Sequence, residues 1–161
     1  MFRELRRKRQ LLPTNECVQI LETGTSGVLA VSGDDGYPYA VPLSYVYCDS
    51  KIYFHCAKSG HKLDAVMRNP KVSFCVIDQD QIVPEEYTTY FRSVIVFGKI
   101  RILAEDTEKR AAIEKLAAKY SPMQEEGRKN EIDKEFPALC MLELSIEHMS
   151  GKEAIELAKK K

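Results

Sequence analysis

The sequence predicts an α+β domain, mainly β, in which an antiparallel sheet of about six strands curls into a barrel. Three observations point to this class. Strand-like runs follow one another with only hairpin signals between them, at Asp34-Asp35-Gly36 and at Asp49-Ser50. Helices and strands do not alternate as they would in a parallel sheet. A long β-rich run, 88–104, contains Gly98, which is typical of a bulge or bend where a sheet curls.

Runs of β-branched and aromatic residues define the strands. The predicted strands are 28–31, 37–47, 51–56, 71–77, 88–104 and 139–146. Because the first three follow one another directly, we expect them to form an antiparallel meander. The strand 37–47 carries Pro38 and Pro42, which cannot donate hydrogen bonds to a neighbouring strand. We therefore expect this strand at a sheet edge or locally unpaired.

Apolar residues at helical spacing, with start and stop signals, define the helices. The predicted helices are 14–23, 59–68, 107–119 and a short one within 121–137. Thr14 is the expected N-cap of the first helix, and Asn69-Pro70 ends the second. The acidic stretch 78–86, which contains a proline, is predicted to be a loop.

Length and composition indicate a single domain over residues 1–161, with a basic N-terminal arm (1–12) and a polar tail (152–161). The chain has 161 residues, 44% hydrophobic and 30% charged, and its 24 basic and 24 acidic residues balance. A dedicated nucleic-acid binder would carry a basic excess, so that class is not expected. No apolar run reaches the roughly 20 residues of a membrane helix, and the first residues lack a secretory core. We therefore expect a cytoplasmic protein without nucleic-acid or membrane partners.

The cysteines and histidines are scattered, which predicts neither a disulfide framework nor a metal site. The chain has five cysteines, an odd number, and none forms a C-x-x-C pair. Cys75 and Cys140 are expected in the core. His55, Cys56 and His61 lie close in sequence, but no fourth ligand accompanies them at useful spacing.

Two local features indicate binding chemistry, and each has a simpler alternative. Lys58, His61 and Lys62 surround a predicted helix start, which suits a phosphate but also an ordinary solvated connection. Backbone groups of the proline-containing strand, near 41–44, suit a planar heterocycle, but the prolines also protect an edge from aggregation. The basic arm 1–12 either touches an anionic group or a partner chain, or is simply solvated. The glycine-rich nucleotide motifs and the nucleophile-elbow pattern are absent from the sequence.

A set of short motifs follows one another along the chain. They are Gly27-Val28-Leu29-Ala30, Tyr37-Pro38-Tyr39, Val41-Pro42-Leu43, Tyr53-Phe54-His55 with Ala57, Gly60 and Lys62, Asn69-Pro70, Val72-Ser73-Phe74, Ser93-Val94 to Gly98, and Gly151-Lys152. In this order and spacing, the motifs resemble the FMN-binding split-barrel family related to pyridoxamine 5′-phosphate oxidase, in the branch of the 5-nitroimidazole resistance proteins. The resemblance extends from about Arg6 to Lys152.

The resemblance implies a six-stranded antiparallel split β-barrel of Greek-key type with short flanking helices. It also implies a homodimer that holds two FMN molecules at its interface. Unpaired apolar strand faces, such as Tyr45, Tyr47 and 94–97, favour the dimer independently. The residues that would contact FMN by similarity are Val41, Pro42, Leu43, Ser44, His55, Cys56, His61, Lys62 and Ser93. Among them, His61 and Lys62 would hold the phosphate, and Ser93 stands where the oxidases have a glutamine.

The expected function is that of an FMN-dependent oxidoreductase, with a nitroreductase as one candidate type and His55 as the catalytic residue. The chain has no tryptophan, whereas the oxidases use a tryptophan and an arginine near their C-terminus, so pyridoxamine phosphate oxidation is not expected. Two alternatives remain open: a non-catalytic flavin carrier or redox sensor, and a binder of haem or a deazaflavin, with His55 or His148 as axial ligand. Arg92 either reaches the phosphate or pairs with an acid.

Overall fold

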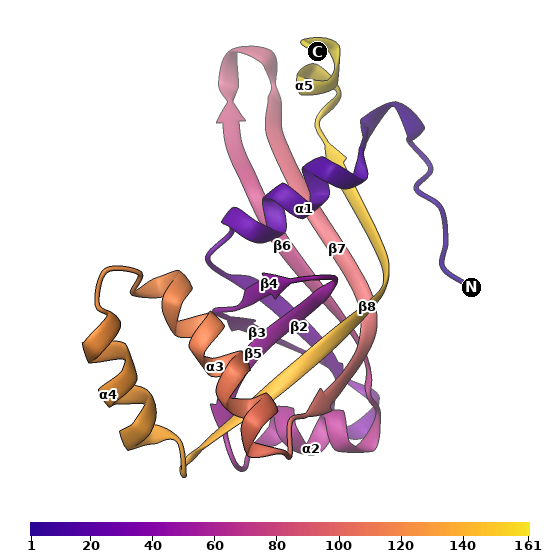
Figure 1. The fold of residues 1–161 in the computed structure, drawn as a ribbon. Helices are drawn as coiled ribbons and strands as arrows, with labels where there is room; N and C mark the ends of the chain where they lie inside the picture. The colour runs from indigo at the N-terminus through magenta and orange to yellow at the C-terminus, as the bar shows by residue number, and fades with distance from the viewer.

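A single strongly curved antiparallel sheet organises the chain in the computed structural model, which describes residues 1–161 (Figure 1). Six strands are long: β2 (Gly27–Ser32), β3 (Pro38–Leu43), β5 (Lys51–Ala57), β6 (Lys71–Val83), β7 (Thr88–Ile102) and β8 (Leu139–Glu153). Two are short: β1 (Leu11–Leu12) and β4 (Val46–Cys48). The strands lie in the order β3-β2-β6-β7-β8-β5-β4, and β1 pairs with β8.

The sheet curls until its two edges approach each other without pairing. Strand β3 forms one edge and β4 the other, yet only Ser44 and Tyr45 separate them in the chain. The three Cα steps from Leu43 to Val46 span at most roughly 11 Å, so the edges must lie close together. The predicted split barrel is thus confirmed, and the strand that carries two prolines lies at an edge, as expected.

The single strand predicted over 37–47 is wrong, because the chain leaves one edge of the sheet at Ser44 and joins the other at Val46. Tyr45 is fully buried in the barrel core, where its ring meets Phe74 edge-to-face at 5.0 Å. Its backbone is held by helix α3 (Asp106–Tyr120): the N–H donates to the Tyr120 hydroxyl at 3.0 Å, and the Lys119 ammonium donates to the C=O at 3.0 Å. Consequently β3 pairs with β2, β4 pairs with β5, and the predicted meander does not form.

The acidic segment predicted to be a loop is instead the outer half of a long hairpin. Strand β6 continues through Asp80↔Phe91 to Val83↔Thr88, and a short turn (Pro84–Glu86) with Tyr87 at φ 52° closes it. Figure 1 shows this arm of β6 and β7 projecting beyond the rest of the sheet. Most side chains on this stretch of β6 are exposed, so its composition resembles that of a loop although its backbone is fully paired.

The bulge expected at Gly98 is present. Phe97 lies opposite His148 and Gly98 opposite Ile146, so Glu147 is the additional residue, on β8. A Cβ on Gly98 would lie 2.1 Å from the Ser145 carbonyl oxygen, which explains why this position holds a glycine. Beyond the bulge β8 continues to Glu153, well past the predicted end at residue 146.

Helices close the barrel and cover one of its outer surfaces. Besides α3 they are α1 (Thr14–Thr23), α2 (His61–Arg68), α4 (Glu125–Glu135) and α5 (Ile155–Lys159). The N-cap of α1 is Pro13, not Thr14. The main core lies inside the barrel and includes residues of α1 and α2. A second, smaller cluster joins Tyr53 and Met141 to α3 and to Ile132 of α4, on the opposite face of β5 and β8. No helix is long and apolar enough to cross a membrane.

Candidate functional site

The N-terminus of α2 presents unused backbone donors. The first intrahelical bond runs from Asp64 N–H to Gly60 C=O, so the N–H groups of residues 61–63 have no helical acceptor. Gly60 precedes the helix at φ 139° and provides no side-chain cap. Lys62 adds a positive charge to the positive end of the helix dipole. This geometry suits a phosphate group.

His61 lies beside these donors and is held against the turn between β2 and β3. Its ring stacks on Tyr39 at 4.2 Å, and its Nε2 lies 3.8 Å from an Asp34 carboxylate oxygen. The Arg68 guanidinium, 3.0 Å from Asp34, neutralises that carboxylate. The imidazole therefore remains at the helix start with its side chain partly exposed, as a phosphate contact requires.

His55 and Ser44 line the same cleft. His55 lies on β5, and Ser44 directly follows the edge strand β3. Both line a cleft of about 440 Å³ beneath α3 and α4. Partial burial, and secondly the nearby Lys62 ammonium, lower the pKa of His55 below its usual value of 6.5. The imidazole is therefore neutral at pH 7 and offers one donor and one acceptor.

Cys56 faces the barrel interior, on the side of β5 opposite to His55. It pairs directly with Cys140, and burial raises the pKa of its thiol to about 11. Cys140 is buried as expected, whereas Cys75 is only half-buried and lies on the outer face of the sheet. The five cysteines are all free.

The strand 41–44 divides its side chains between two environments. Val41 and Leu43 are half-buried and pack against the barrel core. Pro42 and Ser44 are exposed. Because β3 is an edge strand, its outer backbone groups have no neighbouring strand and stay available to a ligand or to another chain.

Ser93 lies apart from the other predicted contacts, on the outer face of β7 opposite Ile77 and Lys152. Pro42 belongs to the same face, at the end of a row of paired residues. The row is Pro42, Val28, Cys75, Ile95 and Ser150. Three strand spacings, roughly 14 Å, separate Pro42 from Ile95, which is two residues from Ser93. One chain thus brings together His61 with Lys62 and Ser44 with His55, and holds Ser93 on the outer face of β7, three strands along the sheet from β3.

Arg92 pairs with acids. Its guanidinium lies 3.3 Å from Glu16, 3.3 Å from Asp78 and 3.5 Å from the buried Glu153. Lys161 completes the cluster at 2.9 Å from Glu153. Arg92 therefore belongs to an ionic group that ties α1 and the hairpin arm to the C-terminus.

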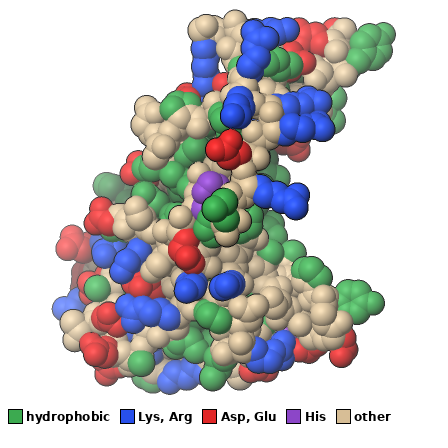
Figure 2. All heavy atoms as spheres, turned by 90° about the vertical axis from the view of Figure 1, so that its right-hand side faces the viewer, with side chains coloured by type: hydrophobic (Ala, Val, Ile, Leu, Met, Phe, Trp, Pro, Cys, Tyr) green, Lys and Arg blue, Asp and Glu red, His purple; other side chains and the backbone are tan.

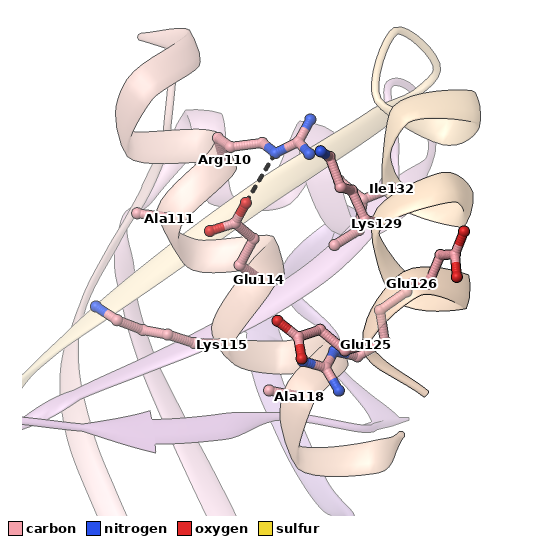
Figure 3. A pocket seen from close by; sticks show the side chains of 10 residues that line it. Arg110, Ala111, Glu114, Lys115, Ala118, Glu125, Glu126, Lys129 and Ile132 are labelled. Carbon is pink, nitrogen blue, oxygen red and sulfur yellow. Dashed lines mark hydrogen bonds and ion pairs between the residues drawn. The ribbon is translucent and has the colours of Figure 1, made fainter. Parts of the chain in front are cut away.

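Further cleft residues were not found from the sequence, because α4 falls in the stretch 121–137, where only a short helix was expected. They include Tyr120, Gly127 and Arg128. A larger groove of about 870 Å³ opens on the outer side of α3 and α4 (Figure 3). Mostly charged, solvent-exposed side chains line it, and one pair of them, Arg110 and Glu114, lies 3.0 Å apart. No cluster of three or more His, Cys, Asp or Glu side chains is arranged to hold a metal ion.

Comparison with known proteins supports the resemblance seen in the motifs. No curated protein matches the chain. A candidate 5-nitroimidazole antibiotic resistance protein from Bacteroides thetaiotaomicron has 19% identity and a TM-score of 0.75, covering 89% of this chain and 86% of its own. A FAD-binding protein from Mesorhizobium loti has 25% identity and a TM-score of 0.68, with coverages of 90% and 97%. A FAD- and haem-binding protein from Mycobacterium smegmatis has 23% identity and a TM-score of 0.74, with coverages of 91% and 73%.

The fold is therefore one on which flavin-binding proteins are built. A family model described as pyridoxamine 5′-phosphate oxidase matches residues 13–153, which is most of the sequence. The chain belongs to the pyridoxamine 5′-phosphate oxidase family.

Proposed function

We propose that this protein binds FMN and catalyses the reduction or oxidation of a small molecule, with a nitroreductase-like reaction as the leading case. The observation that carries the proposal is the uncapped N-terminus of α2, with His61 and Lys62, next to the cleft that holds His55. FMN ends in a single phosphate, and one set of free N–H groups beside a lysine matches it.

In this proposal each chain residue has a defined task. The N–H groups of residues 61–63 and the side chains of His61 and Lys62 bind the phosphate. The edge strand over 41–44 lies along the flavin ring. The bound flavin supplies the two-electron chemistry. His55 orients the substrate and exchanges a proton with it, a task that suits an imidazole whose pKa lies below neutrality.

We also propose a homodimer in which each flavin touches both chains. The outer sheet face carries exposed apolar side chains, with Val28 39%, Ile95 40%, Phe97 38% and Ile77 64% accessible. Within one chain only Phe2 covers part of this face, stacking on Phe97 at 5.3 Å and on His148 at 5.0 Å. Figure 2 shows hydrophobic side chains among charged ones on this side of the molecule, with Lys and Arg toward both its upper and its lower end. An exposed apolar face of this kind favours a partner, and Ser93, on the same face, would then reach the flavin of the second chain.

The prediction that Tyr45 and all of 94–97 need a partner is wrong in part. Tyr45, Val94 and Val96 are fully buried in the barrel core and need no partner, because alternate residues of β7 point inward. Ile95 and Phe97 point outward and are the residues of this stretch that a partner would cover. The five free thiols agree with the proposed cytoplasmic location.

The first experiment is the visible spectrum of the purified full-length protein, with the released chromophore identified by mass. FMN supports the proposal. FAD would retain a flavin cofactor but overturn the inference that the site binds a single terminal phosphate. A haem or deazaflavin spectrum would reject FMN as the cofactor. Sedimentation of the loaded protein should give a dimer, and a monomer with bound flavin would contradict the shared site.

Turnover with a reductant and a nitroaromatic compound then separates an enzyme from a flavin carrier. For an enzyme, the rate must exceed that of free FMN. Equal rates would mean that the protein is only a flavin carrier. His55→Ala should lower the rate by roughly a hundredfold and leave the FMN dissociation constant within about threefold. The control is Tyr87→Ala, at the exposed tip of the hairpin arm, which should change the rate little.

A further inference from the structure

We infer that the cleft between α3, α4 and the end of β5 is a binding site for an uncharged, planar aromatic molecule. Naming that molecule as the substrate rests on the proposed function, since His55 lines the cleft. The existence of the site is argued from the cleft itself.

The cleft has the size and lining of a small-molecule site. Its volume of about 440 Å³ falls within the range of roughly 300–1,000 Å³ that ligand pockets occupy. Helix α3 contributes apolar side chains to one wall, and α4 and the sheet supply the rest. The apolar lining residues are Ile113, Leu116, Ala117, Ile132 and Leu139. Polar side chains stand among them, which is the usual composition of a ligand pocket.

A glycine inside α4 keeps the cleft open. Gly127 lies within the helix, where glycine costs roughly 1 kcal/mol relative to alanine. Its backbone is not in the left-handed region, since only Gly36 and Gly60 among the glycines have positive φ. A Cβ added to it would meet nothing nearer than the Gln124 Cβ, at 3.9 Å. Neither conformation nor crowding therefore requires glycine here, and the missing side chain leaves open space at this point of the cleft lining.

The shape and the available polar groups favour a planar, uncharged ligand. Ala117 on α3 and Gly127 on α4 are the small residues of two facing walls, which leaves a slot between the helices. The side chains of Ser44, His55 and Gln124 also line the cleft and supply its neutral polar groups. Neutral donors and acceptors of this kind orient an uncharged ligand.

The charged residues of the cleft do not call for an ionic ligand. Arg128 donates to the Ser121 and Pro122 carbonyls, at 2.7 and 3.0 Å. Glu131 and Glu135 are exposed, so water solvates them. The cleft therefore has no buried unpaired charge that would require a counter-ion from the ligand.

Helix α4 is the most weakly attached wall, which provides a route of entry. Ile132 is its only buried side chain. Its remaining links to α3 are polar, such as the ion pair between Arg110 and Asp133 at 2.5 Å. Figure 1 shows α4 at the periphery, packed beside α3 and away from the sheet. Segments with few buried apolar contacts open at low free-energy cost, so α4 can admit a ligand without disturbing the barrel.

The test uses the fluorescent probe 6-propionyl-2-(dimethylamino)naphthalene, which is planar, uncharged and sensitive to polarity. Gly127→Phe places an aromatic ring in the slot, and Gly127→Ala is the matched control that improves the helix without filling it. We expect the wild-type protein and Gly127→Ala to bind the probe with dissociation constants within about twofold, and Gly127→Phe to bind at least about tenfold more weakly. Equal binding by the two variants would overturn the inference.

Two further measurements identify what occupies the cleft. Ile95→Gln, on the outer sheet face, should not weaken probe binding, and a loss there would mean that the probe reports the dimer face instead. Saturating FMN should leave probe binding intact, because displacement would mean that the flavin itself fills the cleft. FMN titration of each variant is scored separately: failure of all of them to bind FMN rejects the proposed function, while the comparison at residue 127 still judges the cleft.

Discussion

Replacing Arg92 by methionine tests whether its guanidinium serves the fold or a flavin phosphate. The side chain is one-quarter exposed and lies within 3.5 Å of three carboxylates. Methionine keeps most of the volume and removes the charge. Glu16 and Asp78, each between one-quarter and one-third exposed, then regain water, and each lost pair costs up to about 1 kcal/mol.

Glu153 sets the larger part of the effect. Its side chain is 3% exposed, and without Arg92 its only remaining counter-ion is Lys161 at 2.9 Å. Breaking a fully buried ion pair costs about 3–5 kcal/mol, and the surviving lysine reduces that figure here. We expect Arg92→Met to lower the free energy of unfolding by about 2–3 kcal/mol. For a chain of this length that corresponds to a fall of roughly 4–12 °C in the melting temperature.

The assay combines urea unfolding with FMN titration. Arg92→Met should leave the FMN dissociation constant within about threefold. The double variant Arg92→Met/Glu153→Gln should recover about half of the lost stability, because the uncompensated carboxylate is gone. Unchanged stability together with an FMN affinity reduced tenfold or more would refute the reasoning and assign Arg92 to the phosphate.

Three other substitutions test the fold and the site. Gly98→Ala places a Cβ 2.1 Å from the Ser145 carbonyl oxygen, so we expect a loss of at least about 2 kcal/mol in urea unfolding or failure to fold, and near-wild-type stability would contradict the bulge geometry. Burial and Lys62 lower the folded-state pKa of His55, so the unfolded chain takes up this proton first as the pH falls below about 6.5, and stability declines between that pH and the folded pKa. His55→Gln should therefore show a smaller loss between pH 7 and pH 5, and an identical pH profile would count against the shift. Tyr120→Phe removes the hydroxyl that accepts the backbone N–H of Tyr45, in the segment that connects β3 to β4. This loss should cost about 1 kcal/mol of stability, whereas an unchanged melting temperature would mean that water replaces the hydroxyl.

Local patterns predicted most of the strands, because turn residues punctuate a chain whose strands follow one another. Asp34-Asp35-Gly36 and Asp49-Ser50 do turn the chain, and several of these residues adopt positive φ. These sequence patterns failed where the polarity of the side chains does not reflect the backbone hydrogen bonding. The outer half of β6 is acidic because both of its faces meet solvent, and the backbone hydrogen bonds that make it a strand leave no trace in side-chain composition.

One part of the candidate site could likewise be predicted from local sequence, and another part could not. The α2 N-terminus could be predicted, since its donors and its lysine are contiguous in sequence. The cleft could not, because residues 44 and 55 meet residues 116–135 only after the barrel has formed. Gly127 lies in a charged segment where nothing in the sequence marks it as a site residue, because its role depends on the cleft that it lines in the folded chain. Ser93 likewise matched a family motif, yet its place on the outer face of β7 becomes apparent only in the folded sheet.

The segment Ser44–Tyr45, which carries the chain from one sheet edge to the other, connects the fold with the candidate site. If 37–47 were one strand, as its composition suggests, the chain could not pass from one sheet edge to the other, and Ser44 would not line the same cleft as His55. The transfer depends on burying Tyr45 and on the contacts that Lys119 and Tyr120 make with its backbone, from about 75 positions further along the chain. The same C-terminal end of α3 also lines the cleft through Tyr120. Helix α3 therefore both holds the two sheet edges together and forms a wall of the proposed ligand site, so a substitution that loosens its end should weaken the barrel and the ligand site together.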